Sequence, residues 1–75
     1  MKLVNVGSNQ TEIQTDKLRV LFSYDTPVAY IDLETATRYR TEKKWSVTTS
    51  KHINKWLDRR SANEVPQEIL DGLLE

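Results

Sequence analysis

The stretch KLRVLFSYDTPVAYIDL, residues 17 to 33, decides the fold. From residue 17 to residue 24 every second side chain is apolar or aromatic, and this period of two is typical of a β-strand. Asp25, Thr26 and Pro27 predict a turn, because proline restricts φ and lacks the N–H that a sheet would use. Residues 28–33 are again mostly apolar. The whole stretch therefore predicts a β-hairpin.

Neither strand of this hairpin has a clean polar face. In the first strand Leu21 lies on the face opposite the other apolar residues, and in the second strand Ile31 and Tyr30 lie on opposite faces. An antiparallel sheet with one solvated face alternates more regularly. We therefore expect both faces to be covered, by two helices on one side and the N-terminal segment on the other, by curling of the sheet, or by a second subunit.

Shorter extended segments flank the hairpin, at residues 2–6 and 37–41, and turn-forming residues follow or precede each of them. The period then changes, because Ile53, Trp56 and Leu57 have the i, i+3, i+4 spacing of an amphipathic helix. Val65-Pro66 predicts the start of a second helix. The sequence thus predicts a single α+β domain over residues 1–75. Its small antiparallel sheet of about three to five strands lies within residues 2–47 and is followed by two C-terminal helices, at about 50–60 and 66–74.

Composition excludes several classes of protein. The chain has no cysteine and one histidine, which excludes a disulfide framework and a centre built from several cysteine or histidine ligands. We find no paired carboxylates, nucleophile triad or glycine-rich phosphate loop, so we expect a non-enzymatic protein without a cofactor, a catalytic residue or a metal. No apolar run approaches the ~20 residues that span a bilayer, and the N-terminus does not resemble a signal peptide. The expected location is the cytoplasm.

The formal net charge of zero hides a separation of charge. Residues 38–60 contain eight basic and two acidic residues, a charge of +6, whereas the rest of the chain contains three basic and nine acidic residues, a charge of −6. Such a segment suits phosphates, an acidic partner, or the acidic half of a second copy. The candidate nucleic-acid contacts are Lys43, Lys44, Trp45, Lys51, His52, Lys55 and Arg59.

The string Thr48-Thr49-Ser50-Lys51 is a candidate anion site. Hydroxyl groups, the free N–H groups of a helix start and one ammonium group would together hold a phosphate. The same three hydroxyl residues are also ordinary helix N-caps. The adjacent His52 has two interpretations, a general base or a residue that flanks the buried side of the helix.

The predicted helix places Lys51, Lys55 and Arg59 in one stripe, opposite its apolar side. If Tyr39 faces the helix, its two arginine neighbours project from the far side of the sheet, and the basic residues then form two surfaces. This argument favours a protein-interaction module, one that self-associates or docks on another protein. The alternative is a nucleic-acid-binding domain, for DNA or RNA, that uses the basic segment 38–60.

Two segments, SYDTPVA at 23–29 and KKWSVTTSKHINKWL at 43–57, resemble an uncharacterised small domain of bacteriophages and other prokaryotic mobile elements. The family pattern is SYxTPVA followed by KKxSxTTSKHxNKxL. The resemblance implies a shared fold, a phage or mobile-element setting, a location in the host cytoplasm and a host protein as partner, and it implies no activity. The family often has a glycine where this chain has Thr35-Ala36, so we expect that connection to be built differently.

Overall fold

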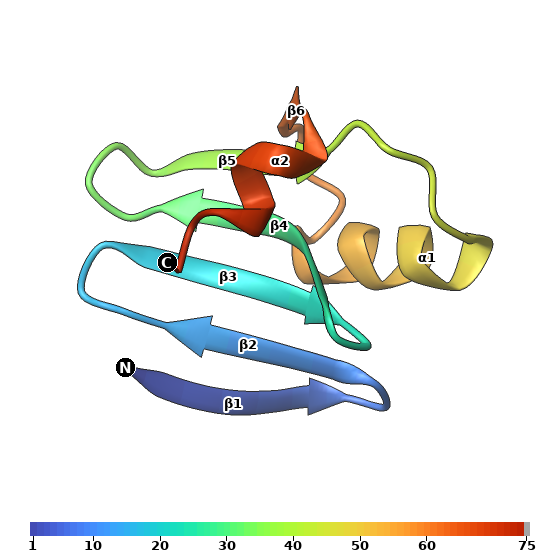
Figure 1. Ribbon diagram of the computed structural model, residues 1–75, viewed down its shortest axis with the longest axis horizontal. Helices are drawn as coiled ribbons and strands as arrows, with labels where there is room; N and C mark the ends of the chain where they lie inside the picture. The colour runs from blue at the N-terminus through green and yellow to red at the C-terminus, as the bar shows by residue number, and fades with distance from the viewer. Residues whose placement is uncertain (75) are drawn as a thin grey trace.

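In the computed structural model, which describes residues 1–74, six strands form one sheet in the order in which they occur in the chain (Figure 1). Five of them form an antiparallel meander: β1 Lys2–Gly7, β2 Gln10–Gln14, β3 Leu18–Ser23, β4 Thr26–Asp32 and β5 Thr37–Thr41. The helix α1, Val47–Trp56, follows β5. The strand β6, Asn63–Val65, then pairs parallel to β5 and leads into α2, Gln67–Asp71.

The prediction of a small antiparallel sheet followed by two helices is wrong. The sheet has six strands and is mixed, and β6 lies between the two helices along the chain. The sequence Asn-Glu-Val of β6 is too short and too polar to show the alternation by which strands are recognised. It forms a strand because the crossover through α1 returns the chain alongside β5, as a parallel connection requires.

Both helices differ from their predicted bounds. α1 begins at Val47 rather than near residue 50 and ends at Trp56 rather than residue 60. It stops there because Asp58 and Arg59 adopt left-handed φ angles of 55° and 57°, which no helix can continue through. α2 is a short helix of five residues with Gly72 at its C-cap, so it is shorter than the predicted 66–74. Within residues 1–74 no helix has the length and apolarity that would let it cross a membrane.

The prediction that both faces of the central hairpin are covered is confirmed. The predicted covering by two helices on one side and the N-terminal segment on the other is wrong, because one helix covers each face. Leu21 is fully buried on the α1 face, in a core that includes Ile53 and Leu57. Its neighbour Val20, which alternation directs to the other face, is fully buried as well. α2 lies across β4 on that second face (Figure 1), where Leu70 is buried.

A buried carboxylate joins the sheet to α1. Glu12 on β2 is 1% exposed. It accepts hydrogen bonds from Arg19 Nε and Nη2 at 3.0 and 2.8 Å, from Trp56 Nε1 at 2.7 Å, and from Gln14. Burial by itself raises the pKa of Glu12, but the hydrogen bonds and the Arg19 charge outweigh it and hold the pKa below its usual value. One ionised group thus links β2, β3 and α1.

We predict that Glu12→Gln lowers the free energy of unfolding by about 2–3 kcal/mol at neutral pH, because the amide leaves the Arg19 guanidinium without its counter-charge. The pKa of Glu12 is lowered on folding. Its stabilising contribution is therefore fully present above the ordinary carboxyl pKa and is lost as the pH falls through the folded-state value.

Urea denaturation at a series of pH values from neutral to acid checks this. The Glu12→Gln variant should lose less stability on acidification than the unmodified chain. Glu68→Gln, which changes an exposed carboxylate on α2, is the matched control and should behave like the unmodified chain. Superimposable curves for the two variants would contradict the role of Glu12.

Candidate functional site

Most of the basic segment lies on the α1 face of the sheet. In the β4–β5 register Tyr39 lies opposite Tyr30, and the two rings stack with centroids 4.5 Å apart. The next residue, Arg40, points to the other face, where its Nη1 donates to Asn54 Oδ1 of α1 at 3.0 Å. Tyr39 therefore faces away from α1. The sequence predicted two separate basic surfaces only if Tyr39 faced the helix, and the structure does not meet this condition.

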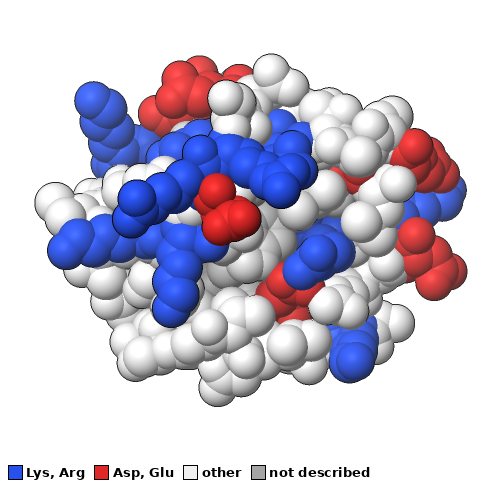
Figure 2. All heavy atoms as spheres, turned by 180° about the vertical axis from the view of Figure 1, so that it is seen from behind, with Lys and Arg blue, Asp and Glu red and all other residues white. Residues whose placement is uncertain are grey.

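The outer surface of α1 concentrates positive charge. Lys51, Lys55 and Arg59 are exposed, and together with Asn54 and Asp58 they line a shallow hollow of about 600 Å³. Figure 2, a view from behind the molecule in Figure 1, shows Lys and Arg side chains gathered on the side that α1 occupies. The predicted outward orientation is confirmed for Lys51 and Lys55 on α1. Arg59 is exposed as well, but it lies beyond the end of the helix at a left-handed φ, so the predicted helical stripe is wrong at Arg59.

The start of α1 uses a residue that the sequence did not single out. Ser46 is the N-cap, and its Oγ accepts a hydrogen bond from Thr49 N at 3.1 Å. Thr49 is buried, and its hydroxyl lies 3.1 Å from Ser23 Oγ and 3.2 Å from Ser46 Oγ. Thr48 and Lys51 are exposed and Ser50 is half-buried. In the predicted anion site, the hydroxyl of Thr49 thus forms hydrogen bonds to other residues of the protein.

His52 is directed toward the sheet. Its Nδ1 lies 2.9 Å from Ser23 Oγ, and its ring centroid lies 6.1 Å from that of Tyr24. Ser23 is 2% exposed, so this hydroxyl is buried within the protein. The contact attaches α1 to the end of β3. Within residues 1–74 no three His, Asp or Glu side chains come together in a way that would hold a metal ion.

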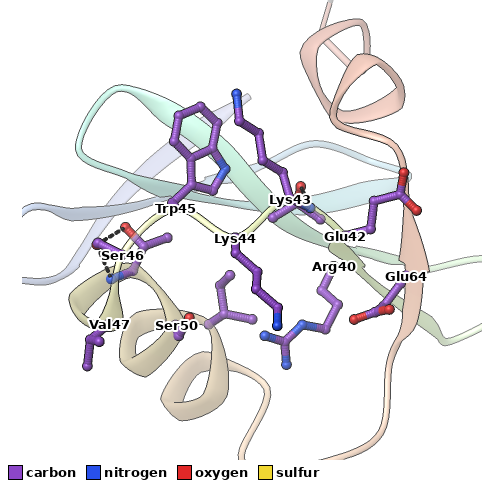
Figure 3. Close-up of a pocket in the computed structure, with 12 residues that line it drawn as sticks. Arg40, Glu42, Lys43, Lys44, Trp45, Ser46, Val47, Ser50 and Glu64 are labelled. Carbon is purple, nitrogen blue, oxygen red and sulfur yellow. Dashed lines mark hydrogen bonds between the residues drawn. The ribbon is translucent and has the colours of Figure 1, made fainter.

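A groove of about 520 Å³ lies between the end of β5 and the start of α1 (Figure 3). Its walls include Arg40, Lys44, Ser50 and Glu64. Figure 3 shows Arg40 and Lys44 extending to the same side of the β5–α1 loop, with their nitrogen atoms toward each other. The Arg40 Nε is buried and has no hydrogen-bond partner within residues 1–74. The guanidinium therefore keeps unused donor capacity.

Trp45 and Lys43 point to the opposite side of the same loop (Figure 3). The Lys43 ammonium lies 4.1 Å from the centroid of the Trp45 ring, within range of a cation–π contact. Trp45 Nε1 donates to Gln67 Oε1 at 3.2 Å, and Gln67 Nε2 donates to the carbonyl of Pro27 at 2.7 Å. These bonds attach the loop to α2 and to β4.

The structure divides the predicted nucleic-acid contacts into three groups. The α1 side holds Lys44, Lys51, Lys55 and Arg59, the α2 side holds Lys43 and Trp45, and His52 is directed toward the sheet. Arg40 was missed as a site residue, because the face of β5 from which it projects depends on register. The sequence signal that could have identified Arg40 is its spacing of two from Arg38, which places both side chains on the same face of a strand.

These features define a class of protein, a small domain whose mixed sheet carries a basic surface on its crossover helix. A family model matches residues 1–72, and the chain belongs to the family of unknown function DUF8033. Neither the curated proteins nor the solved structures gave a match. The family agrees with the predicted uncharacterised small domain, and the phage or mobile-element setting stays a prediction.

We predict that Ser46→Ala destabilises the fold by about 1 kcal/mol, because it removes the N-cap of α1. Thr48→Ala should change stability by only a few tenths of a kcal/mol, since Thr48 is exposed and makes no capping bond. Thermal and urea unfolding followed by circular dichroism measure both variants. A larger loss in Thr48→Ala than in Ser46→Ala would show that the helix starts at the predicted hydroxyl string instead.

Proposed function

We propose that this protein binds nucleic acid through phosphate groups along the outer surface of α1. The observation that carries the proposal is the hollow lined by Lys51, Lys55 and Arg59. Cations that neutralise phosphates release condensed counterions, which drives association with DNA or RNA. Two separate basic surfaces were the argument against this function. The orientation of Tyr39 weakens it, because Arg40 lies on the α1 side with Lys44, Lys51 and Lys55, while Lys43 lies on the α2 side.

Binding of this kind should show little preference for base sequence. Of the two side chains predicted to contact bases or sugars, Trp45 lies on the α2 side of the β5–α1 loop and His52 is bonded to Ser23, so neither belongs to the outer surface of α1. What the α1 face offers a ligand is mainly ammonium and guanidinium groups, and contacts to phosphates carry no direct information about base sequence. The proposal is therefore for recognition of the nucleic-acid backbone.

Fluorescence anisotropy with labelled single-stranded and double-stranded oligonucleotides tests this proposal. We expect the logarithm of the affinity to fall linearly with the logarithm of the salt concentration, by about 0.7–0.9 for each phosphate contact. The double variant Lys51→Gln/Lys55→Gln removes two such contacts and should reduce the slope by about 1.5.

The matched control is Lys2→Gln/Lys17→Gln, which makes the same change in charge at two exposed lysines away from α1. It should leave the slope nearly unchanged. Undetectable binding at low salt, or binding that is insensitive to salt, would remove the proposed function.

A second candidate function, self-association, is favoured by a different surface. On the α2 face, Leu3 is 68% exposed, and with Ile13 and Phe22 it lines a hollow of about 260 Å³. β1 is an edge strand whose outer side is unpaired within residues 1–74, and such edges can pair with another chain. We propose a second copy as the occupant of this edge.

Sedimentation velocity over a range of concentrations should then show a dimer. Leu3→Lys should shift the population toward monomer by placing a charge in the contact, whereas Leu33→Lys, a change at an exposed leucine beyond β4, should not. A monomer at all concentrations would rule out this second function and leave the first untouched.

A further inference from the structure

The groove at the end of β5 occupies a special position in the topology. β5 and β6 run parallel, and the chain leaves their C-terminal ends toward opposite faces of the sheet. After β5 it leads to α1 on one face, and after β6 it leads to α2 on the other (Figure 1). In open α/β sheets built from parallel strands, ligands bind in the crevice outside the strand ends where the connections diverge, and β5–β6 is a single parallel pair with such connections at the edge of an otherwise antiparallel sheet. The groove lies in this crevice.

Three cations line the groove, Arg40, Lys43 and Lys44, and within residues 1–74 none of them has a carboxylate closer than 4.0 Å. In the same range one ion pair is closer than 4.0 Å, that of Arg19 with Glu12. Arg40 is held in place by its bond to Asn54, which leaves its Nε without an acceptor. Glu42 and Glu64 line the same groove and lower its positive charge, but neither forms an ion pair with Arg40 or Lys44.

We propose that this groove binds a phosphate monoester, held by Arg40 and Lys44 with the Ser50 hydroxyl at the wall. A monoester carries close to two negative charges at neutral pH and has three acceptor oxygens, whereas an internal diester of a strand carries one charge. A guanidinium and an ammonium converging on one recess suit the more highly charged group.

The inference rests on the proposed function and specifies it, because the monoester is assigned to the terminal phosphate of a strand lying along α1. Asn54 links the two places: its side chain accepts from Arg40 in the groove, and the same residue lines the hollow with Lys51 and Lys55. A strand whose internal phosphates contact the hollow would thus place its end near the groove. A free mononucleotide offers the same chemistry without the strand.

The test compares one labelled oligonucleotide sequence with a 5′-phosphate, with a 3′-phosphate, and with hydroxyl groups at both ends. We expect one of the phosphorylated strands to bind about tenfold more tightly than the strand without a terminal phosphate. Equal affinities for all three strands would overturn the inference and leave backbone binding intact.

If no strand binds, the proposed function fails. Titrations with inorganic phosphate and with adenosine monophosphate, followed by NMR, then test whether the groove binds a free phosphate group. Amide shifts confined to Arg40, Lys44 and Ser50 would support a site for a free phosphate ester. Absence of shifts with both probes would overturn the inference as well.

A charge-matched set of variants locates the effect. Lys44→Gln should abolish the preference for the terminal phosphate. Lys43 also borders the groove, but its ammonium lies over the Trp45 ring on the other side of the loop, so Lys43→Gln should retain the preference. Glu64→Gln should increase the preference, because it removes a negative charge from the groove. All three residues are exposed, so thermal unfolding should confirm intact folds. Equal losses in the two lysine variants would contradict the site.

Discussion

Burial of the Glu12 carboxylate is the constraint on which the rest of the structure depends. An ionised group with 1% exposure is tolerated only when donors surround it, and its donors come from β2, β3 and α1. Trp56 can reach Glu12 only if α1 lies flat on the sheet, with Ile53 and Leu57 in the core. The same docking directs Lys51 and Lys55 into solvent. The basic surface thus follows from an acidic residue on the other side of the helix.

The strong periodic signals were sufficient to predict the central elements. Alternation in residues 17–24 predicted β3, and the spacing of Ile53, Trp56 and Leu57 predicted both α1 and its buried side. β6 could not be found in this way, because a three-residue strand is stabilised by its neighbour and not by its own pattern. The start of α1 was misplaced because four hydroxyl residues lie within five positions, and only geometry identifies Ser46 as the cap.

The candidate site was less predictable than the fold, because its geometry depends on contacts between residues far apart in the chain. Trp45 is engaged by Gln67 and His52 by Ser23, and no local pattern relates these pairs. The face from which Arg40 projects depends on the pairing of β4 with β5. Charge counting identified the basic segment correctly. It could not tell that strand and helix contribute cations to one side of the molecule.

The parallel pairing of β5 with β6 also has a consequence for the order of folding. The hairpins of the meander join residues that are close in the chain, whereas Tyr39 meets Asn63 only after α1 has been spanned. β6 and the five-residue α2 should therefore assemble last and detach first, since so short a helix forms only when docked. The two tryptophans report on different steps. Trp45, bonded to α2, would sense this late detachment through its fluorescence, and Trp56, bonded to Glu12, would sense only global unfolding.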